Sequence, residues 1–145
     1  RPLPSPYTLD ILWTLPFLID TAGNAADLYD RVSWWDDLNH FVNWGILVLA
    51  FGQLLLLLPV GRLETGALCV GFGAFTAVLW ELAEYVTFIR GGPEEDTAYT
   101  DTLGDLTLGL SGSIVAAVVT AWLLWPRRAR QRERVSTTLS SPAPS

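Results

Sequence analysis

The sequence predicts an all-α fold, a polytopic membrane protein built as a four-helix transmembrane bundle with both termini cytoplasmic. Half of its 145 residues are hydrophobic and the mean hydropathy is +0.33, which is typical of one small membrane domain. Four apolar segments have the roughly 20-residue length that a transmembrane helix needs. Five of the nine Arg follow the last of these segments, and the acids lie near or within the segments, whereas a soluble acidic protein spreads its charges over its surface.

The domain organisation follows from these segments. Residues 1–8 are predicted to be an extended lead-in, residues 9–126 the four-helix transmembrane domain, and residues 127–145 a basic and then disordered cytoplasmic tail. The second and fourth segments carry no charge, and the third is interrupted only by Glu81 and Glu84. The predicted spans are residues 9–29, 41–60, 65–89 and 106–125.

The first span has the weakest signal, because it contains Asp10, Asp20, Asn24 and Asp27. Residues 11–19 are nevertheless apolar, and the polar groups after them have a helical spacing. A signal peptide is the rival interpretation. It lacks support because no basic lead-in precedes the apolar core and acids follow it.

The Arg-rich tail predicts the orientation. Because positive charge favours the cytoplasmic side, the tail and, with four spans, the N-terminus are expected inside. The loops at residues 30–37 and 90–101 then lie outside. Trp34 and Trp35 would mark the outer interface, and Trp122 and Trp125 the inner one. We therefore expect a multi-pass protein of the bacterial plasma (inner) membrane.

Each predicted span carries one stripe of polar residues at helical spacing. From the direction of each helix and a rise of about 1.5 Å per residue, all four stripes reach one layer, the outer third of the membrane. Ionisable groups at such depth face a bundle interior or a water-filled cavity. The stripes are Asp20, Asn24 and Asp27; Asp37, His40 and Asn43; Glu81 and Glu84; and Asp101 and Asp105.

Clustered acids need protons or a bound cation for charge balance. Three chemistries fit: a divalent metal held by carboxylates and an imidazole, metal-free acid–base catalysis, or passage of protons or cations. We expect His40, Glu81 and Glu84 to be catalytic and a divalent cation, of unknown identity, to be the cofactor. The helical phase from His40 favours Asp37 over Asp36. The predicted metal ligands are Asp37, His40, Glu81, Glu84, Asp101 and Asp105.

Structural roles are the alternative for several of these residues. Asp36 and Asp37 could cap the second helix, and Thr100 or Asp101 the fourth. The three glycines and two serines of the last span are expected to allow close helix packing. They are Gly104, Gly109, Gly112, Ser111 and Ser113.

Four short motifs follow one another along the chain, with Gly109 and Gly112 after them: Tyr29-Asp30, Asp37-x-x-His40-Phe41, Trp80-Glu81-x-x-Glu84 and Asp101-Thr102-x-x-Asp105. Their order resembles the YjdF-like bacterial inner-membrane proteins and, more distantly, the VanZ-like family. The resemblance covers residues 10–120 and implies a polytopic helical membrane protein with a role at the cell envelope. Glu84 stands where VanZ-like proteins tend to have Gln, and Asp105 where they tend to have Asn.

The leading functional hypothesis is an outward-facing site that binds a divalent cation and acts on an envelope lipid or a lipid-linked substrate by hydrolysis. The alternative is a non-enzymatic accessory subunit of a larger membrane complex, and the third is a proton or cation carrier. The expected partners are the lipid bilayer and either a lipid substrate or other membrane subunits. No nucleic acid is expected.

Overall fold

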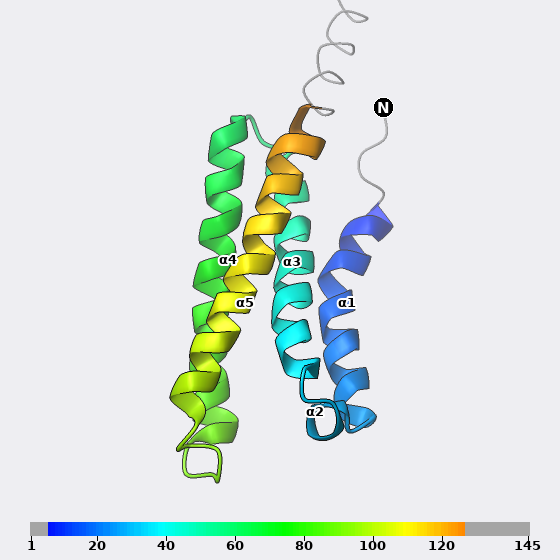
Figure 1. Cartoon of the computed structure of the whole chain (residues 1–145). Helices are drawn as coiled ribbons and strands as arrows, with labels where there is room; N and C mark the ends of the chain where they lie inside the picture. The colour runs from blue at the N-terminus through cyan, green and yellow to red at the C-terminus, as the bar shows by residue number, and fades with distance from the viewer. Residues whose placement is uncertain (1–5, 127–145) are drawn as a thin grey trace, which may run out of the picture.

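The structure, a computed structural model, describes residues 6–126. Over this range it is helical and contains no strand, and four long helices lie side by side (Figure 1). Residues 127–145, the predicted tail, lie outside the described range. The elements are α1 (Pro6–Ala25), α2 (Leu28–Arg31), α3 (Trp35–Leu55), α4 (Arg62–Glu84) continued by the π-helix η1 (Tyr85–Ile89), and α5 (Ala98–Val118) continued by the π-helix η2 (Val119–Leu124).

Three helices of the described range are long and apolar enough to cross a membrane: Trp35–Leu55, Arg62–Ile89 and Ala98–Leu124. α1 is not among them, and its 20 residues include Asp10 and Asp20. Many large apolar side chains on the outer surface of α4 and α5 are exposed, as in a surface that lipid chains cover. The all-α membrane fold is therefore confirmed with three such helices.

α3 is the central helix, because it packs against α1, α4 and α5. Its backbone lies close to that of α5 at Gly112, where an added Cβ would overlap the carbonyl oxygen of Phe41. One turn earlier on α5, Gly109 lies against the indole of Trp44. The prediction that Gly109 and Gly112 allow close packing is thus confirmed. It is wrong for Gly104, where an added Cβ would meet no described atom within 4 Å.

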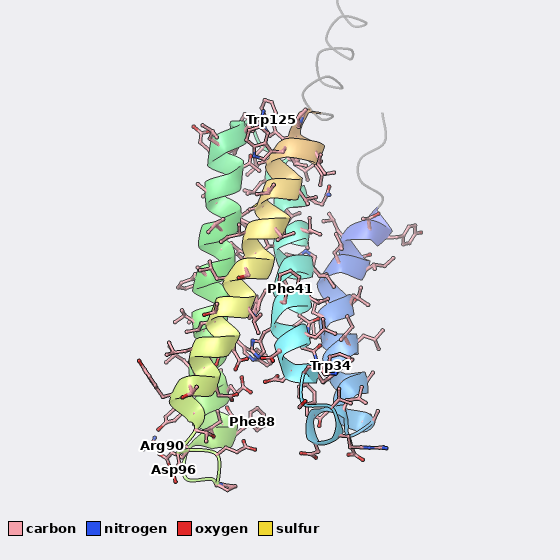
Figure 2. The ribbon with its side chains drawn as sticks, in the orientation of Figure 1. Trp34, Phe41, Phe88, Arg90, Asp96 and Trp125 are labelled. Carbon is pink, nitrogen blue, oxygen red and sulfur yellow. The ribbon has the colours of Figure 1, made fainter. Side chains whose placement is uncertain are left out.

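The two ends of the bundle differ. The start of α1, the α3–α4 link and the end of η2 lie at one end, and α2 and the α4–α5 link at the other (Figure 1). Trp125 and Trp34 lie toward these opposite ends (Figure 2). At the first end the Trp125 indole donates to the carbonyl of Val60 at 3.1 Å, and the guanidinium of Arg62 lies 3.3 Å from the ring centroid of Trp122. These contacts tie η2 to the α3–α4 link.

The first helix differs from the prediction at both ends. It begins at Pro6 rather than residue 9, because Pro is favourable at a first helical position, where its missing N–H has no intrahelical partner. It ends at Ala25 rather than residue 29, because Asp27 takes a left-handed conformation with a φ of 53°. The prediction that Asp27 continues the stripe of Asp20 and Asn24 is therefore wrong.

The helical structure of α3 and α5 begins about two turns before the predicted spans. The residues at their N-cap positions, Trp34 and Thr97, make no side-chain capping bond within the described range. The predicted caps at Asp36 or Asp37 and at Thr100 or Asp101 are therefore wrong, because these residues lie inside the helices. The acids in the first turns still interact favourably with the positive ends of the helix dipoles.

Two matched substitutions on α5 test the close contact between α3 and α5. Gly112→Ala places a methyl group against the Phe41 backbone and is expected to lower stability by about 1–3 kcal/mol, as other overpacked cores do. Gly104→Ala has room and is expected to be neutral or stabilising, by up to about 1 kcal/mol, because Ala favours a helix. Thermal unfolding in detergent measures both. Equal melting temperatures for the two variants would contradict the contact.

Candidate metal centre

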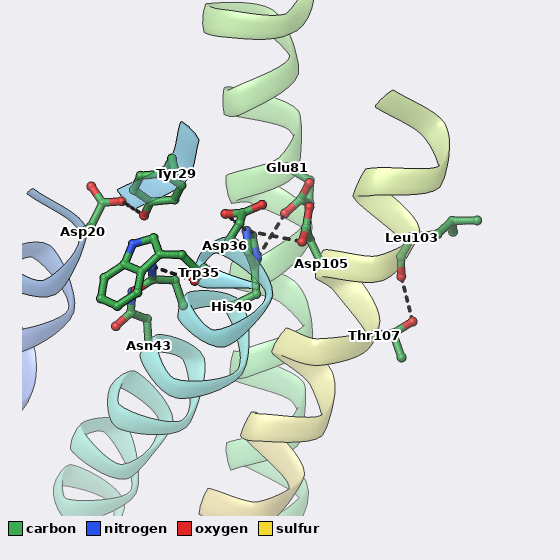
Figure 3. Close-up of polar contacts among 11 residues, drawn as sticks. Asp20, Tyr29, Trp35, Asp36, His40, Asn43, Glu81, Leu103, Asp105 and Thr107 are labelled. Atoms are coloured by element: carbon green, nitrogen blue, oxygen red, sulfur yellow. Dashed lines mark hydrogen bonds and ion pairs between the residues drawn. The ribbon is translucent and has the colours of Figure 1, made fainter. Parts of the chain in front are cut away.

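The side chain of His40 is the centre of the polar cluster. It lies on α3, is only 7% exposed, and faces carboxylates from its own helix, from α4 and from α5 (Figure 3). Its Nε2 lies 3.6 Å from Asp36 Oδ1 and 3.7 Å from Asp105 Oδ1, and its Nδ1 lies 3.6 Å from Glu81 Oε1. Three helices therefore converge on one imidazole.

The close contact between α3 and α5 positions this cluster. Trp44 follows His40 by four residues on α3, and Gly109 follows Asp105 by four residues on α5, so each pair shares a helix face. The packing of Trp44 onto Gly109 thus sets the distance between the helices one turn away, at His40 and Asp105. A side chain at position 109 would push Asp105 away from the imidazole.

Several polar atoms of the cluster are buried without a hydrogen-bond partner among the described residues. They are His40 Nδ1, Glu81 Oε1 and Glu84 Oε2. Glu81 is itself only 6% exposed. A buried polar group without a partner costs about 1–3 kcal/mol, and more when it is charged. A site that contains several such unpartnered, electron-rich atoms is suited to a bound cation.

Two groups of side chains could each hold a metal ion. Asp36, His40 and Asp105 form one group, and His40, Glu81 and Glu84 form the other. In each, one ligand atom per residue lies within 4.8 Å of the others. Imidazole nitrogen with carboxylate oxygens suits zinc, iron, manganese and related divalent ions.

Of the six predicted metal ligands, the structure brings together His40, Glu81, Glu84 and Asp105. Asp37 and Asp101 are exposed and belong to neither group found in the described part of the chain. The residue beside His40 is Asp36, so the preference for Asp37 is corrected. At about 100° per residue, position i−4 lies about 40° around the helix from His40 and position i−3 about 60°, so Asp36 is the nearer.

The predicted stripe of α1 does not join the His40 cluster. Asp20 instead accepts a hydrogen bond from the hydroxyl of Tyr29 at 2.6 Å, and Asn24 is exposed. Burial, and then the bond to Asp20, raises the pKa of the Tyr29 phenol above its ordinary value. This second polar site lies beside Trp35, at the level of the His40 cluster (Figure 3). The polar residues therefore share one level along the bundle but form two sites, and the depth of that level in a membrane stays a prediction.

Sequence reasoning missed Asn39 as a buried polar residue. Its amide donates to the carbonyl of Trp35 at 3.0 Å and its side-chain oxygen accepts from Asn43 at 3.2 Å. The predicted stripe partner of Asn43 was His40, three residues before it. The i, i+4 pair of Asn39 and Asn43 was a signal that could have identified this residue.

Comparison with known proteins gives a family and a relative. A family model described as a predicted membrane protein (DUF2238) matches residues 1–126. An uncharacterised protein of Thermotoga maritima is 31% identical over 108 residues, which are 71% of this chain and 56% of that protein. The chain therefore spans little more than half the length of this relative. No solved structure matches. The YjdF-like proteins belong to the matched family, while the VanZ-like resemblance stays a prediction.

The contact between Asp20 and Tyr29 predicts a pH-dependent difference in stability. The pKa of Tyr29 is higher in the folded protein than its ordinary value of 10.0. The stabilisation that protonated Tyr29 gives the folded state is therefore complete below pH 10.0 and is lost as the pH rises through the folded pKa. Tyr29→Phe is expected to lower the melting temperature at neutral pH, by an amount that corresponds to about 1 kcal/mol. The difference in melting temperature between Tyr29→Phe and the wild type should become smaller as the pH rises to about 11.

The exposed Tyr99 provides the matched control, since its ring is 78% exposed. Tyr99→Phe should leave the melting temperature close to that of the wild type throughout the titration. A Tyr29→Phe variant that behaved in the same way would contradict the role of the bond to Asp20.

Proposed function

This chain belongs to the family of predicted membrane proteins (DUF2238), and from that premise we propose that it is a metal-dependent enzyme of the bacterial inner membrane. Its His40 cluster binds a divalent cation. The enzyme hydrolyses an envelope lipid or a lipid-linked substrate.

One observation carries the proposal: a buried imidazole lies among carboxylates from three helices, and several polar atoms of this cluster have no hydrogen-bond partner in the described range. In an apolar bundle such a set is costly unless positive charge balances it. A divalent cation provides two charges and lowers the pKa of a water bound to it, which is the chemistry that hydrolysis needs.

The position of the cluster supports a substrate from the membrane. His40 and Glu81 are buried between helices whose outer surfaces are apolar, whereas the Asp36 side chain is 41% exposed. A reacting group would therefore approach past Asp36, near the start of α3. A lipid or lipid-linked molecule can bring such a group to this depth while its chains remain in the bilayer.

The same proposal includes a fourth span. α1 has 20 residues, about the 30 Å that the hydrocarbon core requires, and it packs along α3. Its first residues lie at the same end of the bundle as the end of η2 (Figure 1). An even number of crossings, with both ends cytoplasmic, is consistent with this arrangement and with the positive-inside rule.

Cysteine labelling tests the fourth span. With Cys69→Ser as the background, Ser33→Cys lies between α2 and α3, and Tyr7→Cys lies at the start of α1. Ser33→Cys should react with a membrane-impermeant maleimide in intact spheroplasts, and Tyr7→Cys only after permeabilisation. Labelling of both from the same side would contradict the crossing by α1.

Elemental analysis of the detergent-purified protein tests the metal site. The wild type should contain a near-stoichiometric divalent metal, which His40→Ala and Glu81→Ala should lose. Asp37→Asn is the matched control, because this acid is adjacent to Asp36 but exposed. It should retain the metal. Retention in His40→Ala and Glu81→Ala would place the metal elsewhere and contradict the site.

The reaction needs its own measurement. Wild-type protein, with and without chelator, is incubated with vesicles of bacterial envelope lipids, and released products are identified by mass spectrometry. Hydrolysis that requires both the metal and His40 supports the enzyme. A metal-free wild type that co-purifies with a stoichiometric membrane partner would contradict it and favour an accessory subunit.

A further inference from the structure

The two nitrogens of His40 have different surroundings. Nε2 faces Asp36 Oδ1 at 3.6 Å and Asp105 Oδ1 at 3.7 Å. Nδ1 faces Glu81 Oε1 at 3.6 Å, with Glu84 in the same group of potential ligands. Carboxylates thus lie on both sides of a single imidazole.

The chemistry of a neutral imidazole allows only one of these sides to hold the cation. One ring nitrogen carries the lone pair that a metal needs, and the other carries a proton and donates a hydrogen bond. The cation must therefore occupy either the side with the two Glu or the side with the two Asp. The two carboxylates on the other side would accept the hydrogen bond from the protonated ring nitrogen.

The two sides are alike in burial, since the Glu81 and Asp105 side chains are both 6% exposed, but they differ in their buried atoms without a hydrogen-bond partner. On the Nδ1 side, His40 Nδ1, Glu81 Oε1 and Glu84 Oε2 are all buried and lack a hydrogen-bond partner in the described range. Neither Asp36 nor Asp105 has such an atom among the described residues, and the Asp36 side chain is 41% exposed. The buried atoms that lack a hydrogen-bond partner are therefore on the side of the two Glu.

We propose that His40 binds the divalent cation through Nδ1, together with Glu81 and Glu84, while Nε2–H is donated to Asp105 or Asp36. This inference rests on the proposed function, since it assigns the atoms of the same metal site. Asp36 and Asp105 are then positioning residues that hold the imidazole in one tautomer and raise its basicity, as carboxylates beside metal-bound histidines do.

The geometry of α4 supports this assignment. Glu81 and Glu84 are three residues apart and share one face of the helix, so both can reach a single ion. The π-helix η1 begins at Tyr85, directly after Glu84, and π-helical turns are frequent at functional sites. On the other side, the Asp oxygens lie roughly 0.5 Å beyond hydrogen-bond distance of Nε2, a gap that a small side-chain movement closes.

The chain has one His, which makes a direct spectroscopic test possible. The 145-residue chain with 15N-labelled histidine is purified in detergent and loaded with 113Cd2+, whose nuclear spin couples to a bound nitrogen. The expected spectrum shows cadmium coupling at Nδ1 and the proton at Nε2. Cadmium coupling at Nε2 would overturn the inference but leave the metal site intact. Absence of cadmium binding would overturn both the inference and the proposed function.

Matched variants distinguish ligands from positioning residues. Asp36→Asn and Asp105→Asn are expected to weaken Cd2+ binding by about 10–100-fold, the usual effect of losing a partner of a metal-bound histidine. In both, coupling should remain at Nδ1. Glu81→Ala and Glu84→Ala should each reduce binding further, and Asp37→Asn and Asp101→Asn should leave it unchanged.

The reverse ranking would overturn the assignment. If Asp36→Asn and Asp105→Asn abolished the coupling while the Glu variants kept it, the cation would occupy the Nε2 side. Melting temperatures identify any variant that fails to fold. The wild-type spectrum decides the assignment even if a variant is lost, because it needs no substitution.

Discussion

The close approach of α3 to α5 determines much of this structure. Gly112 lies against the backbone of Phe41 and Gly45, so the two backbones meet there without a side chain between them, and Gly109 leaves room for the indole of Trp44. Small residues serve this purpose in membrane bundles because lipid provides no hydrophobic driving force between helices. One turn from Gly109 along α5, the same spacing between the helices brings Asp105 to His40. The packing of small residues thus sets the geometry of the polar cluster.

That cluster concentrates negative charge where it is least favourable. Glu81 and Asp105 are buried beside the chain's single His, and Glu84 and Asp36 lie at its edges. A structure that keeps so many acids near one imidazole needs either protons or a cation, and the unpartnered atoms on the side of Glu81 and Glu84 favour a cation. The partly exposed Asp36 connects this interior to the surface.

The left-handed residue Asp27 separates this cluster from the second polar site. Because α1 ends at Ala25, the chain turns and places Tyr29 back over Asp20, nine residues earlier. The carboxylate of Asp20 thereby has a local hydrogen-bond partner in the Tyr29 hydroxyl. A continuous helix to residue 29 would have left Asp20 without this partner.

The sequence by itself determined the all-α class, the three apolar spans, and the placement of polar residues at one level near the ends of the helices. These features follow from hydropathy and from the 3.6-residue period, which are properties of each segment alone. The membership of His40, Glu81, Glu84 and Asp105 in one cluster was predictable for the same reason.

Only the tertiary structure decided which neighbours each stripe meets. It selected Asp36 over Asp37, left Asp101 exposed, paired Asp20 with Tyr29, and gave a packing role to Gly112 but not to Gly104. Each choice depends on how one helix is rotated against another or on a break such as that at Asp27. Periodicity fixes the angle between residues within a helix, but the rotation of the helix itself is set by the contacts it makes with its neighbours.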